Sequence, residues 1–211
     1  ILIVYPKGHG KGEIIYKRSE DGGKTWSDRL LVPHNWSSSK EVPTIHRVID
    51  EKGLKRLILW SGLYPARLAV SEDDGVTWSV LRPAGDWGGI VVMGAVVDLK
   101  TPGHYLAMFH DDGRFFTKDG KWNGIFTLYQ TNSTDGGLTW SHPFPIYQNN
   151  EIHLCEPGII RSPDGHQLAA LLRENSRTKN SHVIFSNDEG ISWRAPVELP
   201  REVTGEGRTR K

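Results

Sequence analysis

Apolar and polar residues alternate in short runs along almost the whole chain, and this pattern predicts β-strands. The runs are rich in Val, Ile, Leu and Tyr, and Gly, Pro, Asp or Asn residues, which favour turns, bound them. No long stretch repeats its apolar residues with the period of a helix, so we expect little helix. The fifteen predicted strands are 1–5, 13–17, 29–32, 43–49, 56–61, 67–71, 79–81, 91–99, 104–110, 124–131, the stretch after Trp140, 156–161, 167–173, 182–186 and 194–199.

Four segments share the pattern Ser-x-Asp-x-Gly-x-Thr/Ser-Trp, and we call them the repeat turns. They occupy 19–26, 71–78, 133–140 and 186–193, and their starts are 52, 62 and 53 residues apart. One four-stranded propeller blade takes roughly 40–50 residues, so each repeat turn is expected to mark a blade. An Asp two residues before a Gly predicts a tight turn in which Asp accepts backbone N–H groups and Gly takes a positive φ. We therefore interpret these Asp residues as turn formers and not as catalytic acids.

Composition excludes several classes of protein. The 211 residues suffice for a buried core, and the 9% of aromatic residues supply large apolar surfaces that a disordered chain lacks. The 26 basic and 25 acidic residues leave a net charge of +1, which offers no electrostatic basis for binding nucleic acid. No apolar run approaches the roughly 20 residues of a membrane span. The single cysteine, Cys155, has no partner for an internal disulfide.

The four repeat turns resemble the Asp-box, or BNR, repeats of the sialidase superfamily of β-propellers, and the resemblance covers nearly the whole chain. It implies an all-β, sialidase-like β-propeller, six-bladed in the family, of which this chain covers about four blades. We expect residues 1–203 to be part of a single propeller domain, with 204–211 a polar tail or the approach to the next blade. The first unit has three predicted strands and the others four, so we expect the chain to begin inside a blade, without that blade's innermost strand.

A comparison of units within the chain points to a candidate site. Up-and-down strand order places the repeat turns at one edge of the blades and the loops between second and third strands at the other, where propellers usually bind. Aligning the second and fourth units pairs Val42 with Glu156 and Gly62 with Arg173. Because the fold accepts Val and Gly there, the two charges are candidates for function. The alternative is an ion pair that only closes the end of a hairpin.

The residues around this pair strengthen the functional interpretation. The stretches 155–160, 164–165 and 171–175 are similar to the sialidase segment that carries two functional residues. The resemblance implies that Glu156 polarises a tyrosine nucleophile and that Arg173 is one of three arginines that clamp the substrate carboxylate. Both roles are chemically reasonable, because a carboxylate can accept a phenol proton and a guanidinium matches a carboxylate with two hydrogen bonds.

Other parts of the family pattern are not found in the chain. The tyrosine and the other two arginines belong to strands outside this segment. The acid/base aspartate of the family belongs in the loop 6–12, which contains no carboxylate. His9, in that loop, can transfer protons near neutral pH and is therefore a candidate acid/base, although an exposed loop with an inert histidine is an equal alternative.

Further candidates lie on the same face. Asp111 and Asp112 could bind substrate, or Asp112 and Gly113 could form an ordinary turn. Trp36 and Trp87, in loops that enter the second and third units, could stack on sugar rings or cap blade junctions. A metal site of His110 with the two aspartates has no second ligand cluster, so we expect neither a metal nor a cofactor.

The function predicted from these residues is a sialidase-like glycoside hydrolase that acts on terminal acidic sugars of glycans. Two alternatives stay open: a propeller that binds carbohydrate or protein without hydrolysis, and a hydrolase of another glycan with His9 as acid/base. The family resemblance implies an extracellular or periplasmic location. The sugar, its linkage and the oligomeric state are not encoded in the patterns above.

Overall fold

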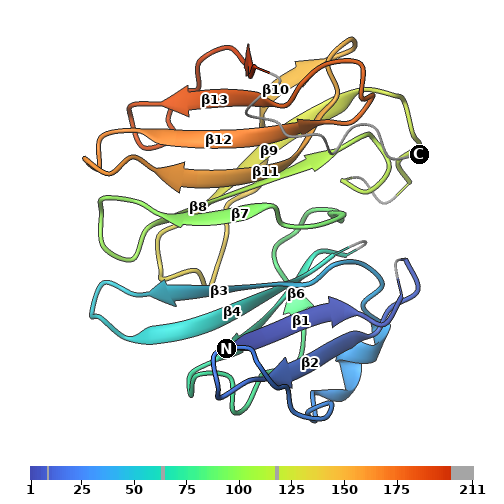
Figure 1. Cartoon of the computed structure of the whole chain (residues 1–211), viewed down its shortest axis with the longest axis vertical. Coiled ribbons are helices and arrows are strands. Elements are labelled where there is room, and N and C mark those ends of the chain that lie inside the picture. The colour runs from blue at the N-terminus through green and yellow to red at the C-terminus, as the bar shows by residue number, and fades with distance from the viewer. Residues whose placement is uncertain (9, 63–64, 117–118, 201–211) are drawn as a thin grey trace.

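The computed structural model describes residues 1–8, 10–62, 65–116 and 119–200, which fold into four antiparallel sheets. The sheets follow one another along the long axis of the molecule (Figure 1). The one helix in these ranges is the short 3-10 helix η1 (His34–Ser38), as the absence of helical periodicity predicts. Within the described residues, no helix has the length and hydropathy that a membrane span requires.

Each sheet is a meander in which neighbouring strands pair antiparallel. The first sheet contains β1 (Leu2–Pro6) and β2 (Ile14–Arg18). The second contains β3 (Thr44–Ile49), β4 (Lys55–Ser61), β5 (Arg67–Ser71) and β6 (Arg82–Pro83). The third contains β7 (Ala95–Asp98), β8 (Tyr105–Asp111), β9 (Phe126–Ser133) and β10 (Phe144–Asn149). The fourth contains β11 (Leu154–Arg161), β12 (Leu168–Glu174), β13 (His182–Ser186) and β14 (Val197–Glu198).

This arrangement confirms the all-β class and the four predicted blades, but two predicted strands are wrong. The segment 29–32 forms no strand: it donates one backbone bond to β2, from Leu30 N–H to Tyr16 O at 3.0 Å, and Pro33 then follows without an N–H. The segment 79–81 is displaced to β6, because the Asn35 side chain takes both backbone groups of Leu81, at 2.9 and 3.0 Å.

The hydrophobic core lies between consecutive sheets. Tyr16, Trp36 and Leu59 belong to the cluster between the first and second sheets. A second cluster, which includes Trp60 and Phe109, joins the second and third sheets, and a third cluster joins the third and fourth. The inner sheets are therefore covered on both faces, and every residue of β8 is buried. Burial on both faces explains why strands of the inner sheets, such as β8, are nearly continuous apolar runs.

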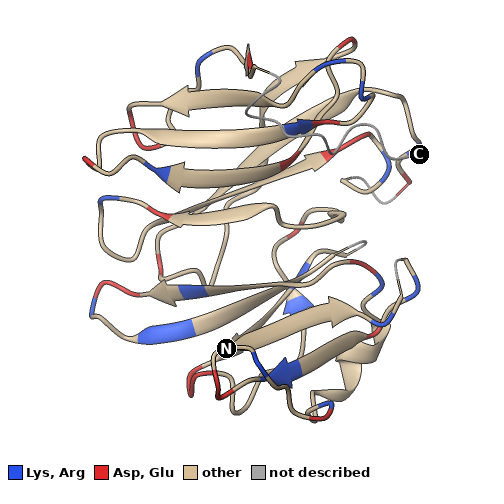
Figure 2. Ribbon diagram, in the orientation of Figure 1, with Lys and Arg blue, Asp and Glu red and all other residues tan. Residues whose placement is uncertain are grey.

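The strands end at two edges with different roles. The repeat turns connect the third and fourth strand positions at one edge, which lies on the left in Figure 1. The loops after β1, β4, β8 and β12 lie at the opposite edge, which we call the mouth edge. Figure 2 shows charged residues mainly at these edges, with Lys and Arg interspersed among Asp and Glu. The predicted tail, 204–211, lies outside the described residues.

Candidate functional site

The repeat turns are closed hydrogen-bond networks of identical design. In each, the Ser hydroxyl donates to the Asp carboxylate and accepts the Gly N–H, while the Asp accepts both the N–H and the hydroxyl of the following Thr or Ser. These bonds measure 2.5–3.0 Å. The glycines Gly23, Gly75, Gly137 and Gly190 all have positive φ. The four Asp side chains thus form turns, as the sequence predicts, and their carboxylates are engaged locally.

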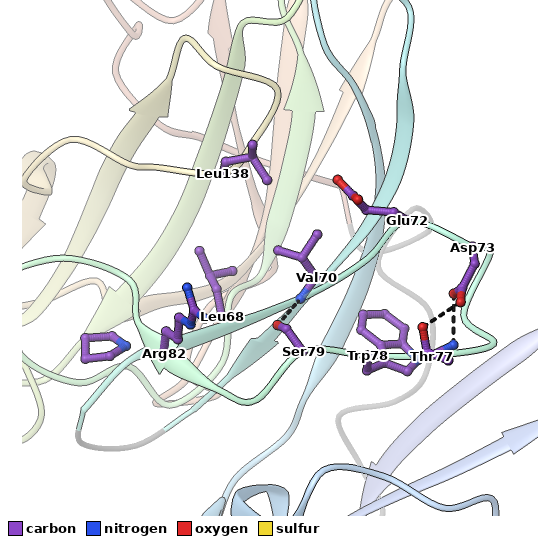
Figure 3. A pocket seen from close by; sticks show the side chains of 10 residues that line it. Leu68, Val70, Glu72, Asp73, Thr77, Trp78, Ser79, Arg82 and Leu138 are labelled. Atoms are coloured by element: carbon purple, nitrogen blue, oxygen red, sulfur yellow. Dashed lines mark hydrogen bonds between the residues drawn. The ribbon is translucent and has the colours of Figure 1, made fainter.

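Two grooves lie beside these turns and away from the mouth edge. One, of about 660 Å³, runs along the outer side of the second sheet past Trp78 to Leu138 (Figure 3). A similar groove of about 710 Å³ lies beside the first repeat turn, between Trp26 and Val76. Because the two grooves occupy equivalent places in successive repeats, they follow from blade geometry and do not mark a specialised site.

The mouth edge of the fourth sheet brings Glu156 and Arg173 together. Arg173 Nη1 lies 2.9 Å from Glu156 Oε1, and both side chains are about half exposed, at 49% and 47%. Arg173 Nη2 also donates to Asn175 Oδ1 at 2.7 Å. The pair borders a groove of about 300 Å³ with Gly158 and Leu171 in its wall. The within-chain comparison thus identifies two residues that the fold does place in contact.

The backbone of Glu156 is unusual. Its φ is 49°, in the left-handed region that favours glycine. It also precedes Pro157, and residues before proline are normally extended. Pairing between β11 and β12 shifts register here, so that Cys155 pairs with Arg173 and Gly158 with Leu171. Glu156 therefore lies on a bulge, a feature common near functional sites.

His110, at the end of β8, contacts this bulge from the neighbouring sheet. Its Nδ1 accepts the Glu156 backbone N–H at 3.2 Å. The pKa of His110 is lowered to about 4, chiefly by burial; the charge of Asp112 opposes this shift, and the charges of Arg173 and Arg114 add to it. The imidazole is therefore neutral near pH 7 and keeps the lone pair that this bond needs. The sequence offered His110 only as a metal ligand, because its contact is 46 residues away along the chain.

Asp111 and Asp112 are both engaged within the loop after β8. Asp111 is 2% exposed, and its carboxylate accepts the N–H groups of Gly113 and Phe115 at 2.8 and 3.0 Å. Asp112 is 5% exposed and pairs with Arg114 at 2.7 Å. Burial raises the pKa of Asp111, although the hydrogen bonds from the loop partly offset this. Both side chains shape the loop after β8, which supports the alternative of a structural turn, and substrate binding by them stays a prediction.

Glu174 has the same structural role in the fourth sheet, and sequence reasoning missed it. It ends β12, is 3% exposed, and accepts N–H groups from His153, Ser176, Thr178 and Lys179. Burial raises the pKa of its carboxyl, but these bonds and the Ser176 hydroxyl together hold the pKa below its usual value. The alignment of the units contains a signal for this role: in two units, a carboxylate residue stands at the end of the second strand.

The tryptophans expected to stack on sugars are packing residues. Trp36 is fully buried against Tyr16 and Trp78, with ring centroids 6.4 and 5.5 Å apart, so no sugar can reach it. Trp87 is half-buried and stacks on Phe109 at 5.7 Å and 8°. Both occupy junctions between sheets; the full burial of Trp36 contradicts its expected role, and stacking of Trp87 on a sugar stays a prediction.

His9, the candidate acid/base, lies outside the described residues. Within the described ranges, no group of three or more His, Cys, Asp or Glu side chains could hold a metal ion.

Comparison with known proteins identifies the family of this chain. The family model described as BNR repeat-like domain matches residues 56–206. The chain belongs to the BNR repeat-like domain family. This membership agrees with the sialidase-like, BNR-repeat superfamily predicted from the repeat turns. No curated protein sequence matches the chain.

Solved structures share the fold of this BNR repeat-like chain. The Hadza microbial sialidase Hz136 is 20% identical with a TM-score of 0.57, over 88% of this chain and 40% of its own. NanB sialidase from Streptococcus pneumoniae is 21% identical with a TM-score of 0.57, over 89% and 29%. An α-L-arabinofuranosidase from Fusarium graminearum is 13% identical with a TM-score of 0.65, over 91% and 60%. The chain thus spans less than two thirds of the length of each of these proteins, and its four sheets correspond to about four blades of a sialidase-like propeller.

Proposed function

We propose that this chain carries part of the substrate site of a sialidase-like glycoside hydrolase that releases terminal acidic sugars from glycans. The observation that supports this most is the half-exposed Glu156–Arg173 pair at the mouth edge, built on a left-handed glutamate. Strained non-glycine conformations persist only where surrounding contacts hold them, and they cluster at functional sites. The aligned positions in the second unit hold Val42 and Gly62, so the fold has no general need for these charges.

Arg173 is the proposed ligand of the substrate carboxylate. Its ion pair with Glu156, at 2.9 Å, and its hydrogen bond to Asn175, at 2.7 Å, orient the guanidinium. The half-exposed fork carries five N–H groups and can offer a pair of them to a carboxylate, which it matches in shape and charge. This would select acidic over neutral sugars.

Glu156 is the proposed partner of a tyrosine nucleophile that lies outside this segment. One of its carboxylate oxygens, Oε1, pairs with Arg173, and the proposal assigns Oε2 to the phenol of the tyrosine. A carboxylate that accepts the proton of a phenol makes the phenol oxygen a better nucleophile at neutral pH. Arg173 would thus hold the substrate and fix the orientation of the carboxylate that activates the nucleophile.

A second candidate is a hydrolase of another glycan, with His9 as acid/base. The similarity to an α-L-arabinofuranosidase supports it, because that enzyme has the same fold and is named for a neutral sugar. The two candidates differ in their need for Arg173: the first requires it, whereas a neutral substrate has no carboxylate for it to bind.

The experiment assays the natural polypeptide that contains this chain on an aryl α-sialoside and an aryl α-L-arabinofuranoside. We expect sialoside turnover whose kcat falls by about 10²–10⁴-fold in Glu156→Gln, while Arg173→Lys mainly raises KM. Glu20→Gln, an exposed glutamate in the first repeat turn, is the matched control and should leave the kinetics unchanged. Turnover of the arabinofuranoside alone would favour the second candidate. Sugar binding without any turnover would contradict both and leave a non-catalytic propeller.

A further inference from the structure

The amide of Glu156 has no partner strand to hold it. Because the β11–β12 register shifts between Cys155 and Gly158, the Glu156–Pro157 step lies outside the regular ladder of the fourth sheet. Its left-handed φ of 49°, directly before a proline, is disfavoured by the local sequence. Something outside the hairpin must therefore stabilise this conformation.

We propose that His110 is a positioning residue for Glu156: its Nδ1 accepts the Glu156 N–H and holds the bulge in the conformation that places the carboxylate on Arg173. The inference rests on the proposed function, in which that carboxylate acts beside the substrate. His110 belongs to the third sheet, so the orientation of a residue in one blade is set by the blade before it.

The imidazole is well suited to this role because its own orientation is fixed. His110 is 8% exposed and stacks on Phe126 with a centroid distance of 5.8 Å and an interplanar angle of 5°. Phe126 in turn stacks on His153 at 5.0 Å and 7°. The three parallel rings leave His110 little freedom to rotate, so Nδ1 stays directed at the bulge.

The neighbouring backbone is shaped to the same contact. Gly94, just before β7, lies directly against Pro157: a Cβ at this position would come 2.5 Å from Pro157 O and 2.7 Å from its ring. The third sheet thus touches the bulge on two sides, through His110 at the amide and Gly94 at the following proline. The close fit explains how one long-range hydrogen bond can select a strained conformer.

Two substitutions separate the hydrogen bond from the ring stack. His110→Phe keeps an aromatic ring of similar size for Phe126 but removes the acceptor. His110→Asn loses the stack but places Oδ1 near the position of Nδ1, so it keeps the acceptor. Both are made in the natural polypeptide, with thermal unfolding as a check of folding. The readouts are kcat and KM on the aryl α-sialoside and hydrogen exchange of the Glu156 amide followed by NMR.

We expect His110→Phe to lower kcat by about 10- to 100-fold, with little change in KM, and to accelerate exchange of the Glu156 amide. His110→Asn should restore most of both. In a Glu156→Gln background, His110→Phe should cause no further loss of kcat, because its effect passes through that carboxylate. Wild-type kinetics in His110→Phe, or equal losses in Phe and Asn variants, would overturn the proposal.

The amide exchange separates this inference from the proposed function. If the wild-type protein hydrolyses neither glycoside, the proposed function fails, and exchange alone decides the positioning role. Protection that is lost in His110→Phe and kept in His110→Asn supports it. Protection that is unchanged in His110→Phe overturns it.

Discussion

At one edge of the sheets the four repeat turns are built alike, whereas at the mouth edge each loop is held by different side chains. The turns repeat four hydrogen bonds with the same donors and acceptors. At the mouth edge, β8 ends in Asp111 and β12 in Glu174, which cap their loops with carboxylates. The strand β4 ends instead in Ser61, whose hydroxyl donates to Ser39 at 2.7 Å.

The difference shows where this fold can vary. In each repeat turn the hydrogen bonds of the repeated Ser, Asp, Gly and Thr or Ser close within eight residues, so the turn forms the same way in every blade and the repeated Asp carboxylate is engaged locally. The mouth loops need partners from other strands, and each blade supplies a different set. Repetition therefore marks the structural edge, and departure from repetition marks the candidate site.

Substitution of Gly75 should have the largest effect, because this turn also contacts its neighbour. A Cβ there would lie 2.4 Å from Tyr16 Oη at a φ of +81°, whereas one on Gly22 would meet nothing within 4 Å at a φ of +76°. We expect Gly75→Ala to reduce the free energy of unfolding by about 2–5 kcal/mol and Gly22→Ala by about 1–2 kcal/mol. Urea denaturation measures both, and equal losses would show that the contact with Tyr16 is unimportant.

The loop after β12 should be the most sensitive part of the mouth edge to loss of one carboxylate. Glu174→Ala removes the acceptor for the N–H groups of His153, Ser176, Thr178 and Lys179. We expect a loss of about 1–3 kcal/mol and faster amide exchange in residues 175–181. Ser176→Ala, which leaves the carboxylate in place, is the control and should change stability less. Unchanged exchange in Glu174→Ala would contradict the capping role.

Asp73, in a repeat turn, and Asp111, in the loop after β8, should respond differently to acid. Hydrogen bonds from the hydroxyl and N–H of Thr77 and from Ser71 lower the pKa of Asp73 from 3.8 to about 2. Its stabilisation is therefore complete above about pH 4 and is lost as the pH falls towards 2. Burial raises the pKa of Asp111, so its contribution to stability instead declines as the pH rises above 3.8.

Unfolding free energies measured against pH test this contrast. Asp73→Asn should flatten the acid loss of stability, and Asp111→Asn should change the slope with the opposite sign. Profiles that shift in the same direction would contradict the dominance of hydrogen bonding at Asp73 and of burial at Asp111.

The smallest effect is expected at Asp74, where two influences oppose each other. Its φ of 55° is strained for a non-glycine residue, and the equivalent Gly22 and Gly136 avoid that strain. Its ion pair with Arg47, at 2.7 Å, joins two exposed side chains. Asp74→Gly removes both, so we expect a change within about 0.5 kcal/mol. A larger loss in denaturation would mean that the ion pair matters more than exposed pairs usually do.

Much of the fold follows from residues close together in the sequence. The repeat turns, the low helix content and most strands were predictable because alternation of apolar residues and Asp-x-Gly chemistry act within a few residues. The strand predicted at 79–81 was wrong because the side chain of Asn35, 46 residues away, binds the backbone of Leu81. The burial of Trp36 was not predicted for the same reason, since its neighbours Tyr16 and Trp78 come from other segments.

The candidate site divides in the same way. Residue types and their spacing predict the repeat, the edge that varies, and Glu156 with Arg173 as the pair that departs from the repeat. The burial of Asp111 and Asp112 in a loop, the left-handed backbone of Glu156, and its N–H bond to His110 of another sheet appear only in the folded chain. Burial and long-range hydrogen bonds depend on which sheets pack together, and packing is a property of the whole fold.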